Sequence, residues 1–169
     1  MTEITHSGDQ TTHLKILGKG SIGHQGPPSS SLLETFGNLY PHRPYVITIA
    51  FPEYTSLCPV TGQPDFGTIV VEYIPHERCI ESKSFKLYLI AFRNHQTFME
   101  TVTNTILEDM VTVLDPLWCR VKGLFEPRGA THLHVFAEHI KEVEEKEKQE
   151  ALHTVIFNWK QQYLPHSWK

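Results

Sequence analysis

The chain has 169 residues, 40% of them hydrophobic and 20% charged, with a net charge of −4. These values fit one packed domain and exclude a broadly basic surface, so we expect no direct nucleic-acid partner. No apolar run approaches the roughly 20 residues of a membrane span, and the first residues lack the pattern of a secretory signal. Three widely spaced cysteines suggest reduced thiols, and we expect a cytoplasmic protein with no membrane partner.

Residues 1–30 are polar and rich in glycine, histidine and serine, which predicts a flexible N-terminal arm. The run from Gly18 to Gly23 matches G-x-G-x-x-G, a pattern that binds dinucleotides only where a helix follows it. Pro27 and Pro28 follow instead. The glycine run is therefore interpreted as part of the arm.

A short helix is expected next, through Leu32, Leu33 and Phe36, after a run of serines that can cap it. The β-branched and aromatic stretch 45–51 predicts a strand. Residues 52–66, which contain three prolines, are predicted to form a loop, and 67–74 a second strand.

Two helices are expected in the middle of the chain. In 81–94, Phe85, Tyr88, Leu89 and Phe92 recur at helical spacing. The second helix covers 97–114, with an apolar face made of Phe98, Val102, Leu107, Met110, Val111 and Leu114.

The last part of the chain predicts a strand at 118–125, a strand at 131–138 and a helix over 141–162. The order β-β-α-α-β-β indicates an α+β fold, in which an antiparallel sheet carries two helices on one face. We expect a domain at 31–140 followed by a C-terminal helical extension at 141–169. One bare sheet face and two open edges favour assembly into a homo-oligomeric ring.

The proline-rich loop carries the first candidate site. Cys58 lies in a polar segment between two strands, and Asp65 follows seven residues later in the same loop. A nucleophilic thiol needs nearby cations or amide dipoles, and a partly buried carboxyl group can keep its proton and donate it. A buried structural cysteine with a turn aspartate is an equally good interpretation of the local composition.

A second candidate lies at the start of the helix at 81–94. Glu81 or Ser82 can cap it, and Lys83 and Lys86 share one of its faces. Two cations at a helix N-terminus can hold phosphates. The alternative is a solvated face with ion pairs inside the helix.

Two segments of the chain are too long and too ordered to match a protein family by chance. They are Ser56 to Phe66 (S-L-C-P-V-T-G-Q-P-D-F) and Glu81 to Tyr88 (E-S-K-S-F-K-L-Y). They resemble the single-domain branch of the NADPH-dependent 7-cyano-7-deazaguanine reductase family. The resemblance covers roughly residues 14–130. It implies the tunnelling fold, stacked pentameric rings, and NADPH-dependent reduction of a 7-deazapurine nitrile to a primary amine for queuosine synthesis in tRNA modification.

The resemblance also implies roles for individual residues. Cys58 corresponds to the cysteine that forms a thioimide, and Asp65 to the proton donor. Five positions correspond to substrate binding, namely Ile80, Glu81, Ser82, Met99 and Glu100. Three correspond to binding of NADPH, namely Lys83, Lys86 and Arg128. No metal is expected.

Two features differ from the family. Met99 stands where the family has a histidine, and the C-terminal end carries His132, His134, His139 and a charged helix of unknown role. Three alternatives stay open: a zinc-dependent pterin-type enzyme of the same fold using His132, His134 and Cys119, an amidine-forming relative, and a non-catalytic ring-assembly protein.

Overall fold

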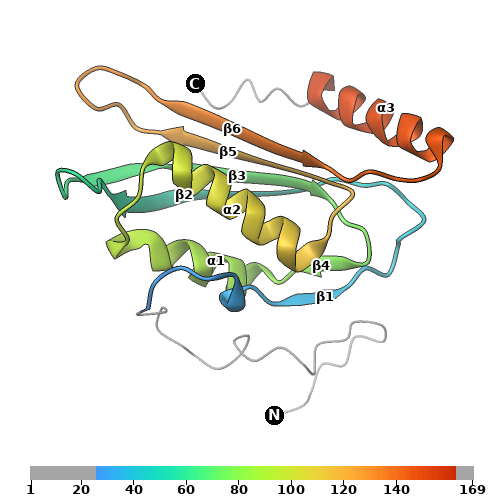
Figure 1. The fold of residues 1–169 in the computed structure, drawn as a ribbon, viewed down its shortest axis with the longest axis horizontal. Helices are drawn as coiled ribbons and strands as arrows, with labels where there is room; N and C mark the ends of the chain where they lie inside the picture. The colour runs from blue at the N-terminus through green and yellow to red at the C-terminus, as the bar shows by residue number, and fades with distance from the viewer. Residues whose placement is uncertain (1–25, 163–169) are drawn as a thin grey trace, which may run out of the picture.

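The computed structural model describes residues 26–162, and its centre is a four-stranded antiparallel sheet in the order β2-β3-β5-β6 (Figure 1). These strands are β2 (Ile47–Leu57), β3 (Pro64–Ile74), β5 (Trp118–Phe125) and β6 (His134–Ile140). The hairpin between β2 and β3 and the loop between β5 and β6 lie at the same end of the sheet (Figure 1). Most of the predicted arm lies outside the described residues.

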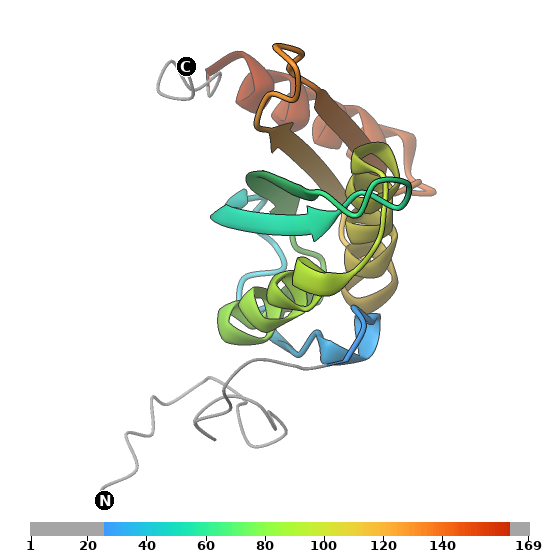
Figure 2. The same ribbon diagram turned by 90° about the vertical axis from the view of Figure 1, so that its left-hand side faces the viewer.

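Helices α1 (Ser82–Ile90) and α2 (Met99–Leu114) cover one face of this sheet, as the end-on view shows (Figure 2). The core between the layers contains the apolar residues predicted for the first helix, and Phe85, Tyr88, Leu89 and Phe92 are all buried. Gly123 on β5 lets α2 approach closely, because a Cβ there would lie 2.5 Å from Thr103 Oγ1. The predicted α+β arrangement is therefore confirmed.

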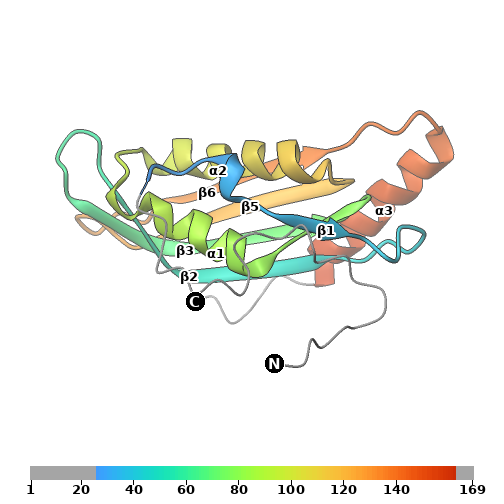
Figure 3. The same ribbon diagram turned by 90° about the horizontal axis from the view of Figure 1, so that it is seen from below.

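The other sheet face is partly covered by α3 (Lys146–Gln162). Leu152 and Ile156 of this helix pack on Ile74 and Trp118 in a second, small core. Seen from below, α3 lies at the end of the sheet opposite the β2–β3 hairpin (Figure 3). The C-terminal helix thus stabilises the end of the sheet that is far from the hairpin.

The prediction of a loop over 52–66 is wrong, because β2 and β3 extend through most of it and leave only residues 58–63 between them. Prolines are tolerated here for two reasons. The pairing shifts register between Phe51 and Tyr54, so Pro52 sits in a bulge of an edge strand. Pro64 is the first residue of its strand, where no ladder bond is lost.

Three shorter predictions also need correction. The expected helix through Phe36 is a single 3-10 turn (Ser30–Leu32), and Phe36 belongs to β1 (Thr35–Gly37), which pairs with β4 (Arg78–Ile80). The first long helix ends at Ile90 and continues as a 3-10 turn (Ala91–Asn94), while the last begins at Lys146. Strand β6 begins three residues later than expected.

Within residues 26–162, no helix is long and apolar enough to cross a bilayer.

Candidate active site

The β2–β3 hairpin holds Cys58 in a fixed turn. The Cys58 amide donates to the Gln63 carbonyl at 2.8 Å, and the Gly62 amide donates to the Cys58 carbonyl at 2.9 Å. Gly62 has a φ of +69°, a conformation that favours glycine. The cysteine is 8% exposed and its thiol is free. The loop therefore presents one reduced thiol at the surface of a cavity.

The surroundings of Cys58 favour its thiolate form. A hydrogen bond with the Thr61 side chain contributes most, followed by the backbone amides of Thr61 and Val60 and by the Arg128 guanidinium. Together they lower the pKa of Cys58 to about 6. A nucleophilic thiol needs this kind of environment.

Asp65 lies on β3 close to this thiol and is only 3% exposed. Burial raises the pKa of its carboxyl group, and the positive charge of Arg128 opposes that rise in part. The pKa values of Cys58 and Asp65 are shifted in opposite directions, which favours a proton on the carboxyl group and a negative charge on the sulfur. Such a pair combines a nucleophile with a proton donor.

Arg128, from the β5–β6 loop, contacts the β2–β3 hairpin at two points. Its Nε lies 3.1 Å from Asp65 Oδ1, and its Nη2 donates to Gln63 Oε1 at 3.0 Å. The turn that positions it contains Gly129 and Ala130, both with positive φ. The predicted partner of Arg128 is a cofactor phosphate, and in this structure its guanidinium contacts Asp65 and Gln63.

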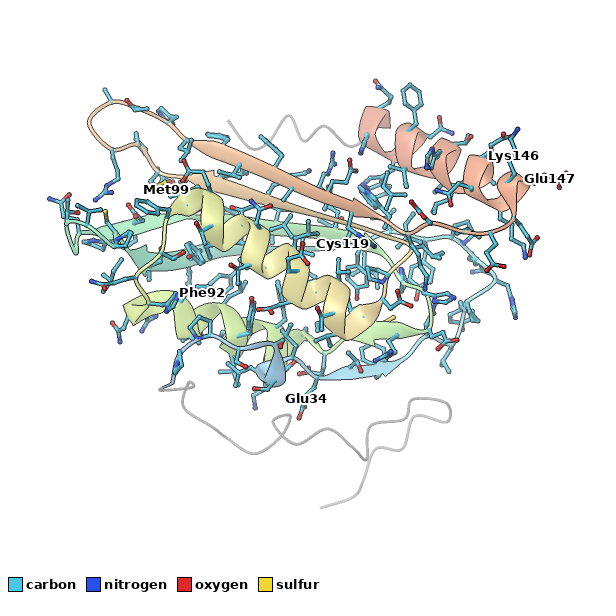
Figure 4. The ribbon with its side chains drawn as sticks, viewed as in Figure 1. Glu34, Phe92, Met99, Cys119, Lys146 and Glu147 are labelled. Carbon is cyan, nitrogen blue, oxygen red and sulfur yellow. The ribbon has the colours of Figure 1, made fainter. Side chains whose placement is uncertain are left out.

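A cavity of about 250 Å³ opens over the pair. Its walls come from the hairpin, from the N-terminus of α2 and from the β5–β6 loop, and Figure 4 labels Met99 at the hairpin end of α2. The lining residues are Cys58, Asp65, Phe98, Met99, Glu100, Glu126, Arg128, Thr131 and Leu133. The cavity brings together five of the ten predicted site residues, namely Cys58, Asp65, Met99, Glu100 and Arg128.

The other predicted residues do not line this cavity. Ile80 ends β4, and Glu81 caps α1 by accepting hydrogen bonds from the amides of Lys83 and Ser84 at 2.9 and 2.7 Å. These two amides are therefore not free to bind a phosphate. The predicted role of the Lys83 and Lys86 side chains in binding phosphate stays a prediction. The Glu34 amide donates to Ser84 Oγ, so Glu34 marks the start of α1. Figure 4 shows Glu34 well apart from Met99, which lines the cavity.

The zinc alternative does not assemble in the part of the chain that is described. Cys119 is fully buried in the core beneath α2, whereas His134 pairs with Leu124 on the opposite face of the sheet. The rings of His132 and His134 lie 6.3 Å apart. Residues 26–162 contain no group of three metal-ligating side chains.

Sequence reasoning missed several residues of the site. Phe98 was assigned to the core but is 53% exposed and lines the cavity from the cap position of α2. Glu126 lines the same cavity from the end of β5. Thr61 lies three residues after the cysteine and hydrogen-bonds to it. This spacing could have indicated the contact, since threonine hydroxyls commonly bond within such turns.

We predict that Cys58 alone reacts with iodoacetamide at neutral pH. Its rate should follow a midpoint near pH 6, while burial raises the pKa of Cys79 and raises that of Cys119 to about 12. Peptide mapping across pH 5–9 measures the three rates. Thr61→Val should move the midpoint upward, and Thr105→Val, a matched change on the exposed side of α2, should not. Equal labelling of all three cysteines at pH 7 would contradict this assignment.

Comparison with known proteins agrees with this geometry. A family model described as QueF-like protein matches residues 64–144. The NADPH-dependent 7-cyano-7-deazaguanine reductase of Nitratidesulfovibrio vulgaris is 62% identical over 162 residues, which cover 96% of this chain and 98% of the relative. The protein of the same name from Desulfovibrio desulfuricans is 60% identical over 163 residues, covering 96% and 98%. That from Neisseria gonorrhoeae is 41% identical over 138 residues, covering 82% and 88%.

A solved structure supports the fold alone. The apo form of the archaeosine synthase QueF-Like superposes with a TM-score of 0.55 at 21% identity, covering 60% of this chain and 99% of that one. The sheet with two helices on one face and the length of the sequence match lead to the same assignment. The chain belongs to the NADPH-dependent 7-cyano-7-deazaguanine reductase family and has its tunnelling fold.

Proposed function

We propose that this chain reduces the nitrile of 7-cyano-7-deazaguanine (preQ0) to the primary amine of 7-aminomethyl-7-deazaguanine (preQ1), a step in queuosine biosynthesis for tRNA modification. The observation that carries the proposal is the pair of Cys58 and Asp65 in one cavity, with pKa values shifted apart. The assay is oxidation of NADPH by the purified chain with and without the nitrile. Two NADPH should be consumed for each amine formed, and no oxidation should occur without the nitrile.

The chemistry follows from the weakness of a nitrile carbon as an electrophile. Attack by the Cys58 thiolate forms a C–S bond, and transfer of the Asp65 proton to the nitrogen gives a thioimide. NADPH supplies the two hydrides. Arg128 stabilises the carboxylate that remains on Asp65, because its Nε already lies 3.1 Å from that group. Expulsion of the thiolate after the first hydride restores Cys58.

The cavity walls fit a flat, polar heterocycle. Glu100 and Glu126 place carboxylates at the cavity, where they can accept hydrogen bonds from ring N–H groups. Phe98 and Met99 add apolar surface for the ring faces. Met99 packs rather than hydrogen-bonds, so orientation of the heterocycle relies on the two carboxylates.

Residues 80–83 contribute to the proposed reaction from a second subunit. They do not line the cavity of their own chain, so we infer that they reach the site of a neighbour in a ring, with stacked pentameric rings as the assembly. The exposed aromatic side chains of Phe66 and Phe136 also favour burial by another subunit. The catalytic unit is then 31–140, and 141–169 is an extension. Free thiols at all three cysteines support a cytoplasmic location.

We predict that two inactive variants will complement each other. Cys58→Ala removes the nucleophile, and Lys83→Glu with Lys86→Glu alters the segment that a neighbour would supply. Subunits of both kinds, unfolded and refolded together, should regain activity that neither has alone. A mixture as inactive as its parts, or full wild-type activity in a sedimenting monomer, would count against a shared site.

The lysines of α1 fit the phosphates of NADPH. No ion pair within residues 26–162 involves Lys83 or Lys86, and both side chains reach solvent. We predict that Lys83→Ala and Lys86→Ala will each weaken NADPH binding by about 10-fold, the expected loss of one charge-assisted hydrogen bond. Fluorescence titration with NADPH and NADH measures this directly. Binding of NADH should change less, and Lys148→Ala on α3 should change neither.

The alternatives are less well supported. The amidine-forming activity of a related fold does not account for the segment from Glu81 to Tyr88, and identities of 60% and 62% are found with reductases. A ring-assembly protein without catalysis has no need of a cysteine whose pKa is lowered to about 6.

A further inference from the structure

Two buried hydroxyl groups next to the active site, those of Tyr54 and Ser56, lack a hydrogen-bond partner among the described residues. Oδ1 of Asp65, close to them, lies 3.1 Å from Arg128 Nε but makes no well-aligned hydrogen bond. The three residues are 1%, 1% and 3% exposed. Buried polar groups are almost always hydrogen-bonded to protein or to ordered water, so this concentration at one place requires an explanation.

The strand register brings the three groups together. Ser56 on β2 pairs directly with Asp65 on β3, and Tyr54 pairs with Gly67. Residues two apart on a strand share a face, so all three side chains point toward the helices. The Tyr54 ring packs between the rings of Phe92 and Phe125, at centroid distances of 5.9 and 6.0 Å.

Electrostatics agree with this proximity. Burial raises the pKa of Tyr54, interaction with the Ser56 hydroxyl lowers it and the charge of Asp65 raises it further. The tyrosine hydroxyl thus keeps its proton and interacts with both neighbours. Three polar groups on one face of the same hairpin are also enough to partner a buried water molecule, which needs two to four partners.

We propose that Tyr54 and Ser56, with one buried water, form a proton relay behind Asp65 that returns a proton to its carboxylate during the reaction. The proposal rests on the proposed function. It assigns Tyr54 and Ser56 as positioning residues, because they act on the substrate through Asp65.

The stoichiometry of the reaction requires a second proton. Converting R–C≡N to R–CH₂–NH₂ adds two hydrides to carbon and two protons to nitrogen. The first proton leaves Asp65 when the Cys58 thiolate attacks, which creates the thioimide and a carboxylate. After the first hydride the nitrogen takes its second proton, the C–S bond breaks and the second hydride completes the amine.

Asp65 must therefore be protonated again while the ligand still fills the cavity. Bulk water cannot approach from the cavity side at that stage, since the substrate and Cys58 occupy it. Two other groups contact or face Asp65: Arg128, whose guanidinium does not release a proton, and the hydroxyl of its cross-strand partner Ser56. Tyr54 also lines a second pocket, together with Glu53 and Arg93. A proton from solvent in that pocket, passed along Tyr54, water and Ser56, reaches the carboxylate from behind.

The test separates the first proton from the second. Without NADPH, thioimide formation uses only the proton already on Asp65, whereas turnover also needs the relay. Tyr54→Phe keeps the ring and removes the hydroxyl, and Ser56→Ala removes the other. We expect each variant to form the adduct within about 2-fold of the wild-type rate while kcat falls about 10-fold. The solvent deuterium isotope effect on kcat should increase.

The control is Tyr88→Phe, which removes another buried tyrosine hydroxyl, one that donates to Asp109. Tyr88→Phe should alter neither the rate of adduct formation nor kcat. Unchanged kcat in both Tyr54→Phe and Ser56→Ala would overturn the relay, as would equal losses of adduct formation and turnover, which indicate a structural role. Amine formation by the wild-type protein tests the proposed function separately.

Discussion

Replacing Cys58 with alanine should abolish reduction of the nitrile, lowering kcat on the order of 10³-fold or more. Without the thiolate no thioimide forms, and hydride would have to add to an unactivated nitrile carbon. Alanine is smaller and apolar, and the site is a hairpin turn held by backbone hydrogen bonds. The fold should therefore survive, which a thermal melt checks alongside the kinetics.

The other two cysteines provide matched controls. Cys79 and Cys119 are both buried, and burial raises both of their pKa values. Cys79→Ala and Cys119→Ala should retain activity and lose about 1–3 kcal/mol of stability from packing. Normal turnover by Cys58→Ala would show that the reaction does not pass through a covalent intermediate in this protein.

Replacing Asp65 with asparagine should lower kcat by about 10²–10⁴-fold, the usual loss when a positioned proton donor is removed. Asparagine has the same shape but carries no acidic proton, so nitrogen cannot be protonated as sulfur attacks. Adduct formation in the absence of NADPH should slow as well, unlike in the relay variants. Stopped-flow or quenched mass measurements give both rates.

A second aspartate tests whether the loss is specific. Asp109 lies on α2 outside the cavity and accepts a hydrogen bond from Tyr88. Asp109→Asn should leave kcat unchanged. If Asp65→Asn kept the wild-type rate of adduct formation, the proton would have to come from another group. Asp65 would then not be the proton donor for attack by Cys58.

The parts of the fold that local pattern determines were predictable. Strand β5 has the bounds expected from its apolar residues, and α2 begins within two residues of its predicted start. The β1–β4 pair was missed because each strand has only three residues and pairs across more than forty positions of sequence. Pattern within so short a segment carries no strand signal.

The site was predictable only in part for a similar reason. Cys58 and Asp65 lie on one hairpin, so their proximity follows from local sequence. Arg128 lies far along the chain, and only the pairing of β3 with β5 brings it to Asp65. The prolines at 52 and 64 suggested a loop where a bulge and a strand start occur, which hid the cross-strand pair of Ser56 and Asp65.

The most direct measurement is intact-mass spectrometry of the protein mixed with 7-cyano-7-deazaguanine and no NADPH. The thioimide mechanism predicts an increase in mass equal to the whole nitrile, since addition of the thiol expels nothing, with the adduct mapped to Cys58. Adding NADPH should remove the adduct and release the amine. An unmodified mass under conditions where the same sample reduces the nitrile would contradict the mechanism.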